Sequence, residues 1–186
     1  MKLIYYTRSD DFNKVQQFLH NDFCFNQLIP VLKYDLSHIV HYTVPKEVTI
    51  KALPLNEESV QQYIRATAQA NEGIADSIGE FWFRAQDESF KAFAAYVGKE
   101  VVGGISVWNM GETGGATESI FVVPDYRRKN IASELIATAL EEFKQRGKQE
   151  VMLSMNGDNG KAMRLYQKLG YELMFYLVEL GQVEST

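Results

Sequence analysis

The sequence predicts an α/β layer fold built on a mixed β-sheet, and two observations support this. Between residues 46 and 180, short apolar stretches with strand character alternate with amphipathic segments of helical period. Two of these strands are joined by a tight turn at Gly98 and form a hairpin, whereas the later strands are separated by helices. Hairpins together with strand–helix–strand units are typical of a layered α/β domain with a mixed sheet.

The expected elements follow from the positions of apolar residues and of helix-ending signals. Asn56 is expected to cap a helix, and Gly147 and Gly170 are each expected to end one. In order, the elements are a strand at 46–53, a helix that begins after Asn56, a helix at 75–86, strands at 90–97 and 101–109, a strand at 116–123, a helix at 130–146, a strand at 150–155, a helix at 159–169 and a strand at 171–180.

The first 45 residues are interpreted as an accessory segment that packs on a main domain of residues 46–186. A strand at 2–8 and a helix at 9–21 are expected within this segment. The alternative is that this segment contributes to a substrate pocket or to the contact of a homodimer.

The composition is that of an ordinary globular domain. The chain has 186 residues, of which 46% are hydrophobic and 23% are charged, and this excludes disordered, collagen-like and low-complexity proteins. The net charge of −5 argues against broad binding to nucleic acid or to acidic membranes. Residues 124–170 alone carry a net charge of +3, so a local site for an anionic ligand is left open.

The sequence also bears on where in the cell the protein is located and on whether it binds a metal ion. No apolar run reaches the ~18–20 residues of a spanning helix, and no signal-peptide pattern is present, so we expect a cytoplasmic protein. The one cysteine, Cys24, excludes an internal disulfide and a cysteine-based zinc cluster, and we expect it to pack beside Phe23 and Phe25. No metal site is expected, because the histidines show no metal-ligand spacing; they are His20, His38 and His41.

The most informative feature is a buried strand that ends at a cationic turn and leads into a long helix. Residues 122–132 read Val-Val-Pro-Asp-Tyr-Arg-Arg-Lys-Asn-Ile-Ala. Such a turn directs backbone N–H groups and the positive end of the helix toward one point, where Arg127, Arg128 and Lys129 add full charges. The turn therefore predicts an anion site, and a phosphate ester is its natural ligand.

This turn resembles the pyrophosphate loop of the GNAT superfamily of N-acetyltransferases, which transfer acetyl from acetyl-CoA to an amine. The family's loop reads Gln/Arg-x-x-Gly-x-Gly/Ala after a Val-x-Pro strand end. Here the strand end is residues 122–124, Arg127 fills the first loop position and Ala132 fills the last. The middle position departs, because Asn130 stands in place of Gly. Asn tolerates left-handed backbone angles, so we expect the turn to persist.

A second motif lies farther along the chain. Residues 159–171, Asn-Gly-Lys-Ala-Met-Arg-Leu-Tyr-Gln-Lys-Leu-Gly-Tyr, are similar to the family's N-x-x-A-x-x-L-Y-x-K-x-G-F/Y signature. Both motifs occur in order with a strand between them, and the resemblance covers about residues 46–180. It implies the GNAT-like acyl-CoA N-acyltransferase fold, an α/β architecture with a mixed, mostly antiparallel sheet and helices on both faces.

The resemblance also implies where acetyl-CoA binds. In the family the pantetheine arm lies in a split between the fourth and fifth strands of the domain and pairs with the backbone of the fourth, like an added strand. The corresponding residues are Ile120, Phe121, Val122 and Val123. The alternative is that they are core residues, and both interpretations can hold together. The pyrophosphate would lie on the loop of Arg127, Arg128, Lys129, Asn130, Ile131 and Ala132. Asn159 would hold the cofactor arm or cap its own helix.

Two catalytic residues are implied in the same way. Tyr166 stands at the family's position for the general acid, and a phenol is protonated at neutral pH; the alternative is a core aromatic residue. Glu118 stands where many members carry a carboxylate that acts as a base. The alternatives for Glu118 are attraction of a cationic acceptor and a place at a frayed strand start. A backbone N–H of the same strand would stabilise the oxyanion.

One departure concerns the end of the domain. The family places two strands after the second motif, whereas only about residues 170–180 are expected to be structured here. We therefore expect the last hairpin to be shortened or missing, which leaves one wall of the acceptor cleft undefined.

The sequence thus predicts an acetyl-CoA-dependent N-acetyltransferase that acts by direct transfer on a small-molecule or peptide amine. The acidic remainder of the chain favours a cationic acceptor such as a polyamine, an aminoglycoside or a basic peptide. The alternative is a non-catalytic acyl-CoA-binding sensor or regulatory module, which Asn130 and the short C-terminal part suggest. A nucleic-acid-binding domain is disfavoured by the total charge.

Overall fold

The structure is a computed structural model that describes residues 3–182, and this part of the chain divides into two compact units. Unit 2 is the continuous segment Asp35–Val151. Unit 1 combines the described residues before Asp35 with those after Val151. None of the helices in residues 3–182 is long and apolar enough to cross a membrane.

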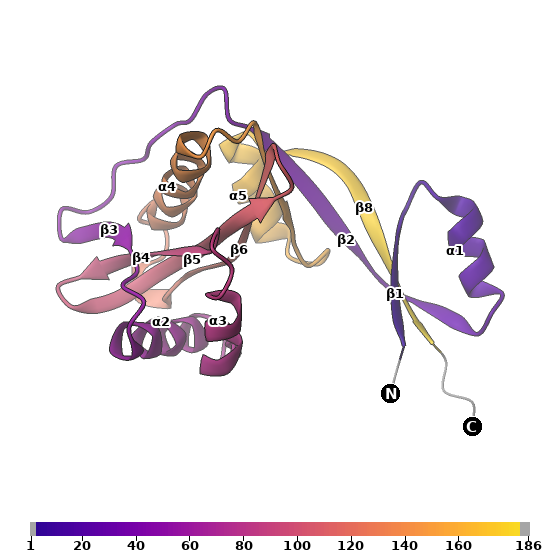
Figure 1. Ribbon diagram of the computed structural model, residues 1–186, viewed down its shortest axis with the longest axis horizontal. Coiled ribbons are helices and arrows are strands. Elements are labelled where there is room, and N and C mark those ends of the chain that lie inside the picture. Colours follow the sequence, from indigo (N-terminus) through magenta and orange to yellow (C-terminus); the bar gives the residue numbers. More distant parts are fainter. Residues whose placement is uncertain (1–2, 183–186) are drawn as a thin grey trace. The chain divides into compact units, whose positions relative to one another are not determined.

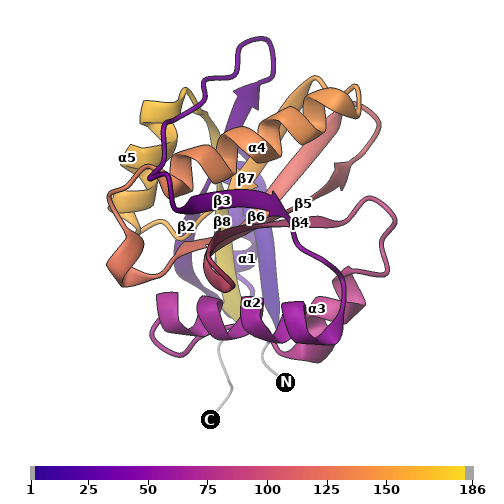
Figure 2. The ribbon, with the colours of Figure 1, turned by 90° about the vertical axis from the view of Figure 1, so that its left-hand side faces the viewer.

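Unit 2 is built on an antiparallel sheet with helices on both faces. Its strands pair in the order β3 (Val48–Ala52), β4 (Lys91–Val97), β5 (Glu100–Met110) and β6 (Gly114–Val122). One face carries α2 (Glu57–Ala70) and α3 (Ile78–Arg84), and the other carries α4 (Ile131–Gln145) (Figure 1, Figure 2). The predicted layered architecture is therefore confirmed, and so is the order of elements from residue 46 onward.

Two adjacent glycines in β5 let the helices approach the sheet closely from both sides. A Cβ atom on Gly103 would lie 3.2 Å from Leu135 and 3.4 Å from Ile131 of α4. A Cβ atom on Gly104 would lie 2.3 Å from the ring of Tyr63 of α2. Because successive strand residues point to opposite faces, this pair places α4 and α2 against the same short stretch of β5.

Local sequence accounts for the ends of these helices. Asn56 caps α2 as predicted, and its side-chain oxygen accepts a hydrogen bond from the Ser59 N–H at 3.0 Å. Ser77 and Glu80 form a capping box at the start of α3, which begins later than the predicted residue 75. Gly147 follows α4 with a φ of +72°, a left-handed conformation that suits glycine after a helix.

Unit 1 contains the strands and helices from both ends of the described chain. They are β1 (Ile4–Arg8), α1 (Phe12–Leu19), β2 (Phe23–Asp35), α5 (Gly160–Leu169) and β8 (Glu172–Gln182), and β7 (Glu150–Ser154) crosses the boundary between the units. Strand β8 pairs antiparallel with β1 on one side and with β2 on the other. The ring of Phe18 in α1 stacks on Tyr5 at 3.8 Å and meets Phe23 edge-on at 5.0 Å.

The structure extends and corrects the expectations for the N-terminal segment. The predicted strand at 2–8 is present from Ile4, and Lys2 lies outside the described residues. The helix at 9–21 is present as the shorter α1. The prediction that Cys24 is packed is wrong, because its side chain is exposed and its neighbour Phe25 is 55% exposed.

Strand β2 is the element that the sequence did not predict. Its pairing with β8 is interrupted between Phe25 and Gln27, where Asn26 is an extra residue, and Pro30 stands inside the strand. Both features break the alternation by which strands are identified. As expected, β8 is the one strand that follows Gly170 in the described residues, and β2 supplies its antiparallel partner.

Candidate functional site

Strand β6 carries a β-bulge at the position where the GNAT resemblance implies pantetheine binding. Ser106 of β5 lies opposite Glu118, and Gly104 lies opposite Phe121, so Ser119 and the residue after it face a single residue of β5. Ser119 has a φ of +54°, a conformation that costs a non-glycine residue about 1–2 kcal/mol. A bulge leaves backbone groups unpaired with the neighbouring strand, and such groups are available to a ligand.

The residues on either side of the bulge have distinct environments. The Ser106 hydroxyl donates a hydrogen bond of 3.1 Å to the carbonyl of Glu118 and so holds the strand at the bulge. Phe121 and Val123 are buried in the core, whereas Ile120 and Val122 are only half-buried. The strand residues predicted to bind the cofactor therefore include two that are core residues.

The turn after β6 has the backbone geometry that the sequence motif requires. A short 3₁₀ turn, Pro124–Tyr126, is followed by Arg128 and Asn130, whose φ angles are +62° and +60°. Asn130 is thus left-handed at the position where the family has glycine. It precedes α4 without a side-chain cap, so its side chain does not occupy the N–H groups of the first helical turn. These N–H groups suit a phosphate, and the turn fits the pyrophosphate of acetyl-CoA.

The side chain of Arg127 stabilises this turn through hydrogen bonds to two backbone carbonyls. Its Nε donates to the carbonyl of Val122 at 3.0 Å, and its Nη2 donates to the carbonyl of Ala70, at the end of α2, at 2.7 Å. The neighbouring Lys129 places its ammonium 4.7 Å from the centre of the Tyr126 ring. Arg127 therefore holds the turn in shape, and its predicted contact with the pyrophosphate stays a prediction.

A segment of unit 2 that the sequence did not single out lies against the start of α4. The Tyr42 N–H donates to Glu134 at 2.6 Å, and the Asn130 side-chain amide donates to the carbonyl of Thr43 at 3.3 Å. His41 contacts Glu134 at 2.9 Å and Glu141 at 3.6 Å. The hydrogen bond with Glu134 raises the pKa of His41, although burial opposes it. We call residues 41–43 the strap.

A cavity of about 460 Å³ lies beside the bulge, within unit 2. Three aromatic rings, two carboxylates, one guanidinium and one amide line it. They belong to Phe83, Phe90, Trp108, Asp87, Glu118, Arg84 and Gln86. Only Glu118 among these residues was predicted from the sequence. Five of the others lie within residues 83–90 and Trp108 lies in β5, and neither stretch matches a known motif.

Arg84 joins two carboxylates at the edge of this cavity. Its Nη1 donates to Glu118 at 3.1 Å, and its Nη2 forms an ion pair with Asp76. The Glu118 side chain is 51% exposed, so it is open to solvent while it is paired. Arg84 thereby fixes the direction of the carboxylate that the resemblance assigns as the base.

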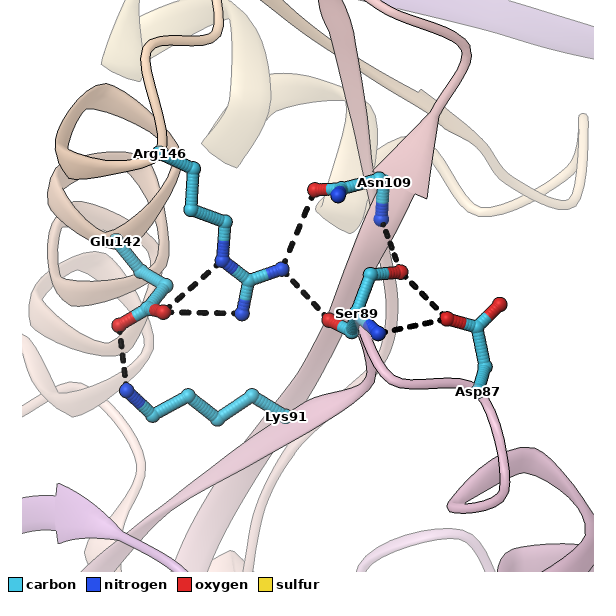
Figure 3. A network of polar contacts seen from close by, with 6 residues as sticks. All are labelled: Asp87, Ser89, Lys91, Asn109, Glu142 and Arg146. Atoms are coloured by element: carbon cyan, nitrogen blue, oxygen red, sulfur yellow. Dashed lines mark hydrogen bonds and ion pairs between the residues drawn. The ribbon is translucent and has the colours of Figure 1, made fainter.

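A polar network holds the loop that carries Asp87 (Figure 3). The carboxylate of Asp87 accepts hydrogen bonds from the backbone N–H of Ser89 at 2.8 Å and from its hydroxyl at 2.7 Å. The Ser89 hydroxyl in turn accepts from the Asn109 N–H at 2.9 Å. The hydrogen bonds from Ser89, with a smaller effect of Arg146, hold the pKa of Asp87 below its usual value, so this carboxylate is ionised at neutral pH.

Two predicted residues lie in unit 1. Tyr166 is 6% exposed, and its ring meets Tyr171 edge-on at 5.3 Å. Burial raises the pKa of Tyr166 to about 12, so the phenol is protonated at neutral pH. Asn159 caps α5 by accepting a hydrogen bond from the Ala162 N–H at 3.1 Å. The catalytic role of Tyr166 and the cofactor contact of Asn159 stay predictions.

Comparisons with known proteins agree with this fold. The sequence model of the acetyltransferase (GNAT) family matches residues 57–171. Acetyltransferase SG1711 of Sodalis glossinidius is 36% identical over 88 residues, which are 47% of this chain and 61% of that protein. The chain thus spans less than two thirds of this relative.

Two solved structures show the same fold. A tandem GNAT protein from the clavulanic acid biosynthesis pathway superposes with a TM-score of 0.81 at 14% identity, over 100% of this chain and 65% of that one. AAC(6′)-Iy in complex with a CoA-containing bisubstrate analogue superposes with a TM-score of 0.59 at 19% identity, over 67% and 90% of the two chains. The predicted GNAT fold is confirmed, and this chain belongs to the GNAT family of acetyltransferases.

Proposed function

We propose that this protein is an N-acetyltransferase that moves the acetyl group of acetyl-CoA directly onto the amine of an acceptor. The observation that carries the proposal is the arrangement of β6 and α4. A bulged strand with a left-handed Ser119 leads, within one turn, to a helix start whose N–H groups carry no side-chain cap. Family membership supports acetyl transfer as the reaction class.

The chain's residues would hold acetyl-CoA in two ways. Backbone groups of Ile120–Val123 would pair with the pantetheine arm, and the first-turn N–H groups of α4 would bind the pyrophosphate. Arg128 and Lys129 would add positive charge, while Arg127 would keep the turn in shape. Asn159 is carried into this set by the sequence motif alone.

The proposed reaction assigns each proton to a residue. Glu118 takes a proton from the acceptor's ammonium, directly or through water, so that the free amine can attack the acetyl carbon. As the C–N bond forms and the C–S bond breaks, a backbone N–H of the bulged β6 stabilises the charge on the carbonyl oxygen. Tyr166, which the sequence motif alone brings into this scheme, gives its proton to the departing thiolate. The second proton that the nitrogen loses as the amide forms returns through water to the Tyr166 phenolate, and Glu118 releases its proton to solvent. Acetyl-CoA supplies the acetyl group and the thiol leaving group.

The structure weakens the two arguments for a non-catalytic sensor. Asn130 takes the left-handed angles that glycine would take, so its presence does not distort the turn. Strand β8 has an antiparallel partner in β2, so its pairing is complete without a further C-terminal strand. The division into an accessory segment 1–45 and a catalytic domain 46–186, and the cytoplasmic location, remain proposals from the sequence.

Thiol release from acetyl-CoA across a panel of amines tests the function, with calorimetry of CoA binding measured in parallel. We expect turnover with at least one amine, and we expect Tyr166→Phe to lower kcat about 10²-fold without changing CoA affinity. Binding of CoA without turnover on any amine would favour the sensor. An unchanged rate in Tyr166→Phe would remove this residue from the mechanism.

A further inference from the structure

We infer that the acceptor is a primary amine on a planar, apolar body, without a carboxylate, and that it binds in the cavity beside Glu118. An arylalkylamine such as tryptamine represents this class. The inference rests on the proposed function, because it names the substrate of the same site. It narrows the set of cationic acceptors that the sequence suggests, because it disfavours polyamines and aminoglycosides, which carry several positive charges.

The lining of the cavity provides the first argument. Phe83 of α3, Phe90 before β4 and Trp108 of β5 bring three rings to one space. Phe83 is 74% exposed, although large apolar side chains are ordinarily covered. Trp108 is half-buried, and Phe90 is already buried in the core. A planar apolar ligand would cover the exposed parts of the Phe83 and Trp108 rings, whereas a hydroxylated sugar or a chain of ammonium groups would match them poorly.

The charges provide the second argument. Among the residues that line the cavity, Asp87 and Glu118 are acidic and Arg84 is basic, so the lining carries one net negative charge. Asp87 is held ionised in a fixed position by its hydrogen bonds from Ser89. One ammonium group neutralises this lining, and several would not.

The ion pairs of Arg84 provide the third argument, because they explain why a ligand that carries a carboxylate is excluded from the cavity. Its guanidinium already forms ion pairs with Asp76 and Glu118, so its positive charge is neutralised and does not attract a further anion. A carboxylate on the ligand would instead meet Asp87 and Glu118 in the same small space. Arg84 therefore acts as a specificity-determining residue that favours an amine over the corresponding amino acid.

The size of the cavity agrees with a small ligand. Its volume of about 460 Å³ lies within the range of about 300–1,000 Å³ that is common for small-molecule sites. Its position beside the bulged β6 brings Glu118 into contact with both the cavity and the proposed transfer site. A ligand whose rings lie against Trp108 would thus carry its amine toward the proposed base.

Calorimetry without acetyl-CoA tests binding separately from turnover, with tryptamine, phenethylamine, spermidine and tryptophan as probes. We expect tryptamine to bind at least tenfold more tightly than spermidine and tryptophan. Trp108→Leu should weaken tryptamine binding at least tenfold, while Trp82→Leu, a matched change outside the lining, should leave it unchanged. Glu118→Gln should weaken it as well, with Glu88→Gln as the matched control.

Folding of each variant is checked by its melting curve, and Trp108→Phe, which keeps a ring, should retain most of the affinity. Equal or tighter binding of spermidine, or unchanged binding in Trp108→Leu, would overturn the inference. Acetylation of spermidine but not of tryptamine would refute the inference and leave the proposed function intact. Binding of tryptamine without acetylation of any amine would refute the proposed function, and with it the assignment of tryptamine as a substrate.

Discussion

Arg146 donates a hydrogen bond of 2.6 Å from its guanidinium to the backbone carbonyl of Ser89, and so ties the end of α4 to the loop after α3 (Figure 3). Glu142, which is largely buried, holds the guanidinium through Nε at 3.0 Å and Nη2 at 2.9 Å. The same carboxylate binds Lys91 at 2.6 Å. These bonds fix the loop that carries Asp87 into the cavity.

Arg146→Met should therefore loosen this loop while keeping the apolar part of the side chain. We expect the free energy of unfolding to fall by about 1–3 kcal/mol, because a charged hydrogen-bond donor to Ser89 and Glu142 is lost. Tryptamine affinity should fall, and CoA affinity should not. Urea denaturation and calorimetry measure the two effects. Lys144→Met, an exposed change on the same helix, is the control, and equal stability of the two variants would contradict the role of Arg146.

Asn130 offers a test of backbone conformation at the anion-binding turn. Asn130→Gly and Asn130→Ala both remove the side-chain amide that donates to Thr43, so they differ chiefly in backbone freedom. We expect the alanine variant to be about 1–2 kcal/mol less stable than the glycine variant, because alanine resists a φ of +60°. CoA should also bind more weakly to the alanine variant. Identical stability and CoA affinity would show that the left-handed angle is not required.

Tyr63 is a buried residue whose hydroxyl has no hydrogen-bond partner within residues 3–182. Its ring packs on Gly104 and meets Phe121 at 5.0 Å, and burial raises the pKa of the phenol. Tyr63→Phe should raise the free energy of unfolding by about 1 kcal/mol, since an unsatisfied buried polar group is removed. Tyr63→Ala should instead lower it by about 3–5 kcal/mol through loss of the ring. Chemical denaturation of both variants decides the point, and a less stable Tyr63→Phe would reveal a partner for the hydroxyl.

The contact between His41 of the strap and Glu134 of α4 is expected to make the stability of the fold depend on pH. Its pKa is raised in the folded state by the hydrogen bond to Glu134, opposed by burial and aided by Glu141. A raised pKa means that protonated His41 stabilises the fold fully below its unfolded pKa of about 6.5, and that this contribution is lost as the pH rises through the folded pKa.

Melting curves of the wild type and of His41→Gln test this effect. The difference in Tm should be larger at about pH 5.5 than at about pH 8.5, where neutral histidine and glutamine are similar. In the background of Glu134→Gln the pH dependence of this difference should shrink, because the main partner of the imidazolium is gone. A difference that is constant with pH would disprove the ion pair between strap and helix.

Arg127 and Lys129 carry equal charges on the same turn but differ in their contacts. Arg127→Ala removes two hydrogen bonds to backbone carbonyls, so we expect lower stability as well as weaker CoA binding. Lys129→Ala loses only the exposed contact with the Tyr126 ring, so it should lower the Tm less than Arg127→Ala does and weaken CoA binding through loss of charge. This weakening should diminish at high salt, where the charge is screened. Calorimetry at two salt concentrations, with melting curves, separates the two roles.

Much of the fold is readable in the sequence because its elements end at residues with clear chemistry. Asn56, Gly147 and Gly170 mark helix ends, and the apolar run before Pro124 marks β6. Strand β2 escapes detection because Pro30 and the extra Asn26 break its alternation, and its identity as a strand depends on pairing with distant β8.

The site was predicted only where its residues match the motifs or positions of a known family. The turn from Arg127 to Ala132 forms a motif, whereas Phe83, Trp108 and Arg84 meet Glu118 only through the pairing of strands and the placement of α3. The bulge likewise has no local signal, because its left-handed residue is Ser119 and not a glycine. Such groupings arise from tertiary packing, and local propensity does not encode them.

The pairing of β2 with β8 has a consequence for the order in which the molecule assembles. During synthesis, β1, α1 and all of β2 except its last residue, Asp35, leave the ribosome before unit 2, whereas β8, the antiparallel partner of both strands, is translated after unit 2. Closing so long a loop is entropically slow, and unpaired strand edges are prone to aggregate meanwhile. Unit 2 contains the local hairpin of β4 and β5, and local contacts form fast, so we expect unit 2 to fold before unit 1 is complete.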